Sequence, residues 1–192
     1  MNRAIRTHPS RPRTVTLTGV AALLFALLLA LAVTAGAEPG NDNRAPELTG
    51  ECEKLTVEAG NKVAVHAYAV GVQVYRWNGT GWSFVGPEAV LYHADGGNGE
   101  FGIHYAGPTW ESVSGSKVVA AVVDRCTPDP DAIPWLLLRA SASDGPGIFD
   151  GVTYIQRVNT TGGLAPAEPG VVVDEEVEVP YTAEYYFYRA HR

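Results

Sequence analysis

The chain has 192 residues, of which 14 are basic and 21 acidic, and its formal net charge is −7. This length allows a single core-forming domain once an N-terminal export segment is set aside. The acidic balance, without a basic stripe, argues against nucleic acid as a partner because phosphate backbones would be repelled.

The first 37 residues have the three parts of a cleavable secretory signal peptide. Four arginines precede an apolar run over residues 20–33, and Ala35-Gly36-Ala37 follows as a cleavage site. Cleavage after Ala37 would leave 10 basic and 21 acidic residues, a net charge of −11, and no membrane attachment. The alternative is an uncleaved anchor, because residues 14–37 are uncharged and long enough to span a bilayer. We therefore expect a secreted or cell-envelope protein.

The sequence contains two cysteines, Cys52 and Cys126. In a chain bound for an oxidising compartment, a pair of this kind predicts a disulfide. The alternatives are two free thiols, or a catalytic thiol that would need His66 or His104 beside it.

Residues 38–50 are polar and rich in turn formers, so we assign 38–61 as a polar leader before an all-β domain at 62–192. Short runs of β-branched and aromatic residues alternate there with turn formers, and no helical period persists. They predict a single-domain β-barrel or β-sandwich of about 8–10 short antiparallel strands. The predicted strands are 62–69, 72–77, 82–85, 89–93, 100–105, 117–124, 135–142, 152–158, 171–179 and 182–188.

Two local patterns refine this assignment. Asn78-Gly79-Thr80-Gly81 predicts a hairpin turn, because Asn and Gly tolerate positive φ. The continuously apolar residues 118–123 and 136–138 predict strands that are covered on both faces.

Seven ordered segments resemble a family of exported bacterial and fungal proteins, known as domain of unknown function 3455. The resemblance implies no established activity. In that family a cysteine often follows the Q-x-Y strand and another follows the G-G-x-A-P segment, where this chain has Trp77 and residues 168–170. This departure implies the loss of one disulfide. The matching segments are GVQVY (71–75), PEAVLY (87–92), GIHYAGPTW (102–110), SGSKV (114–118), IPWLLL (133–138), VTYIQRVNTTGG with LAP (152–166) and VPYTAEYYFY (179–188).

Reactive side chains gather in the segment 104–111. His104 beside Glu111 or another carboxylate would act as a general base, whereas His104, Tyr105 and Trp110 as ligand contacts would line a pocket. The simpler interpretation is that His104 and Trp110 are sheet residues bonded to the backbone. Arg157 and Asn159 share one face of a predicted strand and would meet an anionic or hydroxyl-rich ligand, unless Arg157 pairs with an acid and Asn159 closes the turn.

No cofactor is predicted. Residues 97–102 formally match the glycine pattern of dinucleotide-binding folds, but the segment that follows contains Gly107-Pro108 and cannot form the required helix. His66, His93 and His104 fall on three predicted strands, yet their spacing does not require a metal site, and we assign none.

Three hypotheses follow. The first is a binding module for a small molecule or glycan, with His104, Tyr105, Trp110, Arg157 and Asn159 near its pocket. The alternatives are a structural or stress-related envelope protein, and a hydrolase or isomerase that uses His104 with a carboxylate. The sequence leaves the oligomeric state open.

Overall fold

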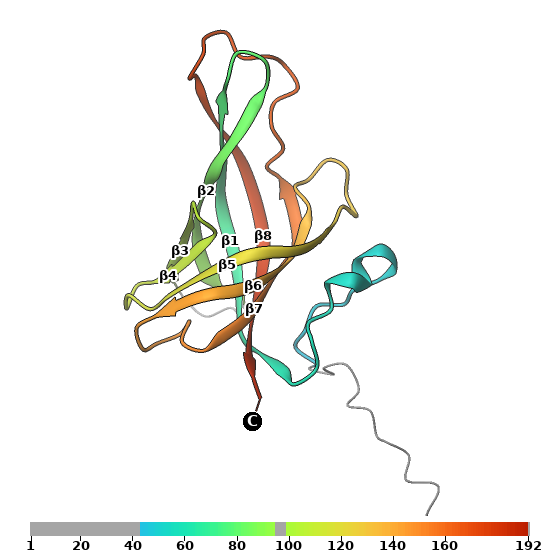
Figure 1. The fold of residues 1–192 in the computed structure, drawn as a ribbon, viewed down its shortest axis with the longest axis vertical. Coiled ribbons are helices and arrows are strands. Elements are labelled where there is room, and N and C mark those ends of the chain that lie inside the picture. The colour runs from blue at the N-terminus through green and yellow to red at the C-terminus, as the bar shows by residue number, and fades with distance from the viewer. Residues whose placement is uncertain (1–42, 95–98, 192) are drawn as a thin grey trace, which may run out of the picture. The chain divides into compact units, whose positions relative to one another are not determined.

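Eight antiparallel strands follow one another around a closed barrel in this computed structural model, which describes residues 43–94 and 99–191. Each strand pairs with the next, and β8 pairs back with β1 (Figure 1). The elements are η1 (Gly50–Leu55), a 3-10 helix, and the strands β1 (Asn61–Trp77), β2 (Trp82–His93), β3 (Glu100–Tyr105), β4 (Thr109–Ser112), β5 (Lys117–Cys126), β6 (Trp135–Asp144), β7 (Val152–Gly162) and β8 (Glu176–Ala190). The predicted all-β fold is confirmed, and the barrel is the form adopted. The predicted signal peptide lies outside the described residues.

Three pairs of predicted strands are continuous, in β1, β2 and β8. In β1 and β2 the predicted break contains a glycine at which neighbouring backbones approach closely. Gly71 lies inside β1, where a Cβ atom would be 2.1 Å from the carbonyl oxygen of Glu88. Gly86 lies inside β2, where a Cβ atom would be 2.6 Å from that of Ala106. These glycines allow close strand contact and do not end the strands. The predicted turn at 78–81 is confirmed, with the Asn78 N–H donating to the Gly81 carbonyl at 3.0 Å.

Two strand predictions are wrong. The short strand β4 was not predicted, because it spans four residues between turn formers. The predicted strand at 171–179 begins only at Glu176, and Val171, Val172 and Val173 are exposed in the preceding connection. There, the carboxylate of Glu175 accepts from two backbone N–H groups and closes a local turn.

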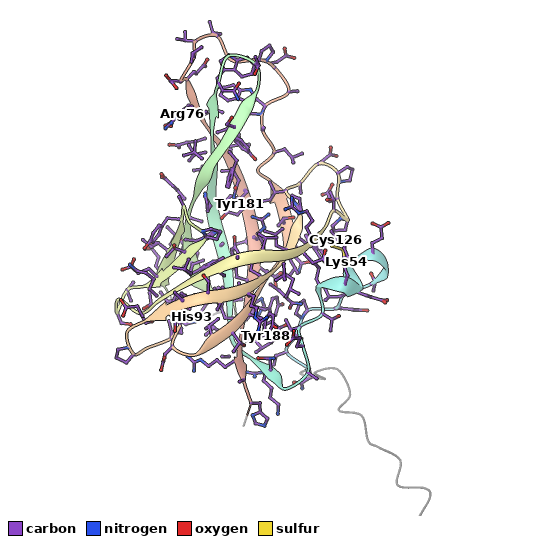
Figure 2. The ribbon with its side chains drawn as sticks, viewed as in Figure 1. Lys54, Arg76, His93, Cys126, Tyr181 and Tyr188 are labelled. Carbon is purple, nitrogen blue, oxygen red and sulfur yellow. A yellow bond between two sulfur atoms is a disulfide. The ribbon has the colours of Figure 1, made fainter. Side chains whose placement is uncertain are left out.

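The barrel interior holds one apolar cluster, rich in aromatic rings from β8 and small alanines from β1 and β2. Phe149, in the β6–β7 connection, closes one end of this interior. Its ring lies 4.8 Å from Phe187 and 6.2 Å from Phe101, and it is fully buried. Figure 2 shows Tyr181 and Tyr188 toward opposite ends of the barrel part of β8.

A second apolar cluster lies outside the barrel, where residues of η1 pack with residues of β5, β6, β7 and β8. Cys52, Leu55 and Val57 of the predicted leader are buried there. Leu137 packs in this outer cluster and Leu138 in the inner one, so the prediction that 136–138 is covered on both faces is confirmed. For 118–123 it is wrong, because Val122 and Val123 are exposed.

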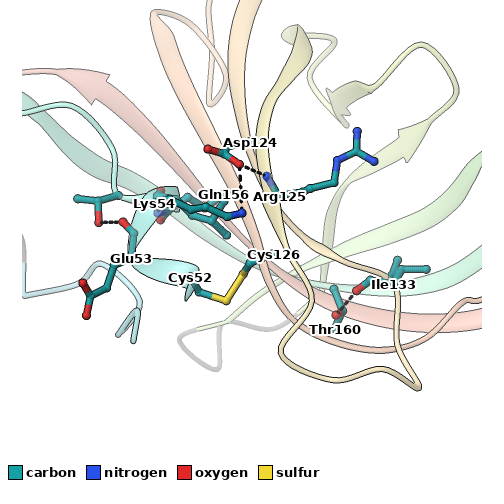
Figure 3. Close-up of a disulfide and its surroundings, with 11 residues drawn as sticks. Cys52, Glu53, Lys54, Asp124, Arg125, Cys126, Ile133, Gln156 and Thr160 are labelled. Atoms are coloured by element: carbon teal, nitrogen blue, oxygen red, sulfur yellow. Dashed lines mark hydrogen bonds and ion pairs between the residues drawn. A yellow bond between two sulfur atoms is a disulfide. The ribbon is translucent and has the colours of Figure 1, made fainter. Parts of the chain in front are cut away.

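The Cys52–Cys126 disulfide fastens η1 to the end of β5 across 74 residues of sequence (Figure 3). The predicted disulfide is therefore present. Lys54 lies 3.7 Å from the carboxylate of Asp124 beside it. The buried Gln156 side chain donates to the Leu55 carbonyl at 2.7 Å and accepts from the Tyr188 hydroxyl. Covalent and hydrogen-bonded contacts thus hold η1 on the barrel wall. No helix in the described ranges has the length and apolar character needed to cross a membrane.

Candidate functional site

A cavity of about 430 Å³ opens at the barrel end opposite Phe149, and we call it the mouth cavity. All eight strands contribute to it: β1, β3 and β5 near their C-terminal ends, β2, β4 and β6 near their starts, and β7 and β8 through Arg157 and Tyr185 farther from their ends. Turns at that same end complete the wall. The lining residues are Gln73, Tyr75, Phe84, Val85, Gly86, Pro87, His104, Gly107, Pro108, Trp110, Val122, Arg125, Ile133, Pro134, Leu136, Leu138, Arg157 and Tyr185.

His104 reaches the mouth cavity from β3, where it pairs in register with Trp110 of β4. The two rings stack at 4.3 Å with 7° between their planes, and the edge of Tyr185 lies 5.3 Å away. The Nδ1–H donates to the Thr109 carbonyl at 2.8 Å, which leaves the lone pair on Nε2. Burial lowers the pKa of His104 to about 3, so the ring is neutral near pH 7.

Arg157 reaches the cavity from β7, opposite Tyr185 of β8. Its Nε and Nη2 both donate to the Pro134 carbonyl, at 3.2 and 2.8 Å. Ile133, the residue before Pro134, is fixed to β7 because its carbonyl accepts from the Thr160 hydroxyl at 2.6 Å. The interpretation in which Arg157 pairs with an acid is wrong, since its partner is a backbone carbonyl and it forms no ion pair with a described carboxylate.

Tyr105 and Asn159 lie outside the cavity lining. The Tyr105 hydroxyl donates to the carboxylate of Glu111 at 2.7 Å, and that carboxylate lies 3.2 Å from Lys117. Glu111 is therefore committed to Tyr105 and Lys117, and the prediction that it could share a face with His104 is wrong. Asn159 has a φ of 50° and donates to Glu184 at 3.1 Å. The structure thus brings His104, Trp110 and Arg157 together and leaves Tyr105 and Asn159 apart.

Sequence reasoning missed three polar residues of the cavity wall. Gln73, Tyr75 and Tyr185 line it from β1 and β8. Gln73 is nearly fully buried, and its isolated amide within the apolar run GVQVY was the available signal. The Tyr75 hydroxyl donates to the Gly163 carbonyl at 2.7 Å, and burial raises its pKa. Burial likewise raises the pKa of Tyr185, so both hydroxyls keep their protons.

Three buried polar atoms of the cavity wall have no hydrogen-bond partner among the described residues. They are Gln73 Nε2, Trp110 Nε1 and the Tyr185 hydroxyl. The Tyr185 hydroxyl lies near Tyr181 and Arg157, and the Gln73 amide lies near Tyr181, but none of these contacts has hydrogen-bond geometry. Leaving such atoms unpaired costs about 1–3 kcal/mol each.

The three histidines considered for a metal site lie in different surroundings. The Nε2–H of His66 donates to the Glu184 carboxylate at 2.7 Å, and the His66 ring stacks on Tyr186 at 3.9 Å. His93 stacks on Phe101 at 4.5 Å, and His104 lies in the mouth cavity. Residues 43–94 and 99–191 contain no group of three side chains placed to hold a metal.

One family model matches most of this chain. No curated protein and no solved structure matches the chain significantly. The model of one family, described as a protein of unknown function (DUF3455), matches residues 58–189, which include β1 to β7 and all of β8 but its last residue, and do not include Cys52. The chain therefore belongs to the DUF3455 family.

Proposed function

We propose that this protein is an exported β-domain that binds a small molecule in the mouth cavity. The observation that carries the proposal is the cavity itself, because about 430 Å³ is within the range of small-molecule sites. Its wall also has the composition of such sites. Apolar side chains such as Phe84, Val85 and Leu136 surround a few polar groups.

The unpaired polar atoms support the same proposal. Gln73, Trp110 and Tyr185 are buried in the wall, and each carries a polar hydrogen without a described acceptor. Buried polar groups of folded proteins are nearly always hydrogen-bonded. A bound molecule that supplies acceptors would remove the cost of leaving these donors unpaired. Such a molecule would therefore gain more binding free energy here than in a cavity lined by apolar groups alone.

The chemistry of His104 favours binding over acid–base catalysis. Its Nδ1–H is committed to the Thr109 carbonyl, its ring stacks on Trp110, and its pKa is lowered to about 3. A general base works best with a pKa near the operating pH. His104 therefore serves as a neutral hydrogen-bond acceptor through Nε2, and we do not propose the hydrolase or isomerase alternative.

The disulfide supports the extracytoplasmic part of the proposal, because such bonds persist in oxidising compartments. N-terminal sequencing of protein recovered from outside the cytoplasm tests it. A mature chain beginning at Glu38 is the expected result, and a chain that retains Met1 would contradict it.

A thermal-shift screen of sugars, small acids and neutral aromatic compounds tests binding in the cavity. A ligand at about 100 times its Kd stabilises the folded state by about 2.7 kcal/mol, which raises Tm by roughly 5–10 °C in a domain of this size. Leu136→Trp fills the cavity and should abolish the shift. Val113→Trp, at an exposed position outside the cavity, is the matched control and should keep it. A screen without any shift, or shifts that persist in Leu136→Trp, would refute the proposal.

A further inference from the structure

We infer that the ligand of the mouth cavity is a small apolar monocarboxylate whose carboxylate pairs with Arg157. This inference rests on the proposed function and narrows it from small molecules in general to one chemical class. It excludes neutral glycans as the preferred ligand.

Arg157 has hydrogen-bonding capacity left over. A guanidinium group has five N–H donors, and the contacts with Pro134 occupy the edge formed by Nε and Nη2. The fork formed by Nη1 and the second Nη2 hydrogen makes no contact of hydrogen-bond geometry with a described residue, although the Tyr185 hydroxyl lies near the guanidinium group. That fork matches the two oxygens of a carboxylate, so a bidentate pair can form without breaking the contacts to Pro134.

The charge of the cavity is opposite to that of the chain. The sequence has 21 acidic residues against 14 basic ones, yet the lining, which lies wholly in the described part of the chain, includes Arg125 and Arg157 and no carboxylate. Asp124, next to Arg125, faces Lys54 at 3.7 Å. The positive charge of Arg157 also acts on Tyr75, His104 and Tyr185 around the wall. A half-buried cation in this setting favours an anion over a neutral ligand.

The unpaired atoms of the wall indicate an acceptor-rich ligand. Gln73 Nε2 and Trp110 Nε1 can only donate, and the Tyr185 hydroxyl has a proton to donate. A carboxylate offers two oxygens with about four acceptor positions and no proton. A sugar hydroxyl would also bring donors, which Gln73 Nε2 and Trp110 Nε1 cannot accept.

The apolar residues of the cavity wall determine which apolar group the ligand can carry beside its carboxylate. Phe84, Val85, Pro87, Val122 and Leu136 offer apolar surface, and Phe84 lies 5.6 Å from the ring of Tyr75. Such a wall suits an aromatic ring or a short hydrocarbon chain. One carboxylate is expected, because Arg157 is the cation in the buried part of the wall and Arg125 is exposed at its rim.

Isothermal titration of the purified protein tests the inference with 4-phenylbutyrate, its uncharged amide 4-phenylbutyramide, and glucose. Charged hydrogen bonds contribute enough that the acid should bind about 10- to 100-fold more tightly than the amide. Arg157→Gln removes the charge, so it should weaken binding of the acid by about that factor and binding of the amide much less. Arg157→Lys should retain a preference for the acid. Arg76→Gln removes an exposed arginine paired with Glu176 and is the matched control.

The outcomes separate the two proposals. If acid and amide bind equally to the wild-type protein, or glucose binds best, the charge inference is wrong while binding in the cavity stands. If Arg157→Gln is folded, as an unchanged Tm would show, and still prefers the acid to the same extent, Arg157 is not the partner of the carboxylate. The inference is then also wrong. If no compound binds here or in the broader screen, the proposed function fails, and the inference fails with it. The wild-type comparison of acid with amide decides the matter even if the variants do not fold.

Discussion

The imidazole of His104 lies flat against the indole of Trp110 inside the barrel, with ring centroids 4.3 Å apart and 7° between the planes. Both side chains are buried, and the Nδ1–H of His104 is bonded to the Thr109 carbonyl. Protonation of this ring would add a positive charge to a cavity whose lining already includes Arg125 and Arg157. The fold therefore requires a neutral His104.

This requirement predicts loss of stability in mild acid. Burial is the main cause that lowers the pKa of His104 from 6.5 to about 3, the hydrogen bond to Thr109 opposes it, and Arg157 adds to it. Between pH 6.5 and about 3, His104 binds a proton in the unfolded chain but not in the folded chain. The contribution of neutral His104 to the free energy of unfolding is therefore complete above pH 6.5 and decreases as the pH falls. The free energy of unfolding should drop by up to about 1.4 kcal/mol per pH unit from this group.

Urea unfolding between pH 7 and 5 measures the effect. His104→Gln should flatten the pH dependence, whereas His191→Gln, at an exposed position, should preserve it. Equal pH dependence in the wild type and His104→Gln would mean that another group takes up the proton.

The disulfide should contribute substantially to stability, because it closes a loop of 74 residues. In the chain-entropy model such a loop stabilises the fold by about 4 kcal/mol through restriction of the unfolded chain. Cys52→Ala with Cys126→Ala should lower the denaturation midpoint accordingly. Reductant should produce the same loss in the wild type and none in the double variant. A double variant as stable as the wild type would show that packing of η1 alone suffices.

Gly71 should be one of the least replaceable residues of the barrel. A Cβ atom there would lie 2.1 Å from the Glu88 carbonyl oxygen and 2.5 Å from the Cα of Ala89, so backbone must move. Gly71→Ala should cost at least about 2 kcal/mol, measured by chemical unfolding. Gly81→Ala is the control, since a Cβ atom there would have no heavy atom within 4 Å and the φ of Gly81 is ordinary. Equal stability of the two variants would contradict the close strand contact.

The fold was predictable where the signal was local, and much of the site was not. The structure contains most of the predicted strands, the turn at Asn78 and the disulfide. The strands and the turn were predicted from neighbouring residues, and the disulfide from the oxidising compartment expected for the chain. Gly71 and Gly86 divided strands in the prediction because a sequence does not show which backbones approach one another. Their role appears only when the sheet closes.

The prediction of the site residues was partly wrong for a related reason. Arg157 and Asn159 have the same parity along one strand, which predicts a shared face. The register between β7 and β8 shifts between Val158 and Thr161, and Asn159 has a positive φ, so the two side chains separate. The missed Tyr185 comes from the last strand, and its place beside His104 depends on closure of the barrel across the whole chain.

Trp77 and Gly170 should accept a second disulfide. A Cβ atom on Gly170 would lie 2.7 Å from the Cβ of Trp77, so the two positions are in contact although 93 residues separate them. Disulfides join Cβ atoms about 3.8 Å apart, so the connection containing Gly170 must open by about 1 Å. Since the resemblance to DUF3455 implies cysteines near both positions in many members, the contact gives that pattern a physical basis.

The test places Trp77→Cys and Gly170→Cys in the background without Cys52 and Cys126. The pair should oxidise in air, resist thiol alkylation, and restore about 2–4 kcal/mol of the free energy of unfolding relative to its reduced form. Loss of the contact between Trp77 and Trp82, whose rings lie 5.4 Å apart, affects both redox states and cancels in this comparison. The control combines Trp77→Cys with Gly81→Cys, so that it shares one of the two positions. If oxidation raised the free energy of unfolding of this control as well, a local cross-link within the hairpin would explain the stabilisation. Free thiols in the oxidised Trp77 and Gly170 variant would mean that the two positions do not meet.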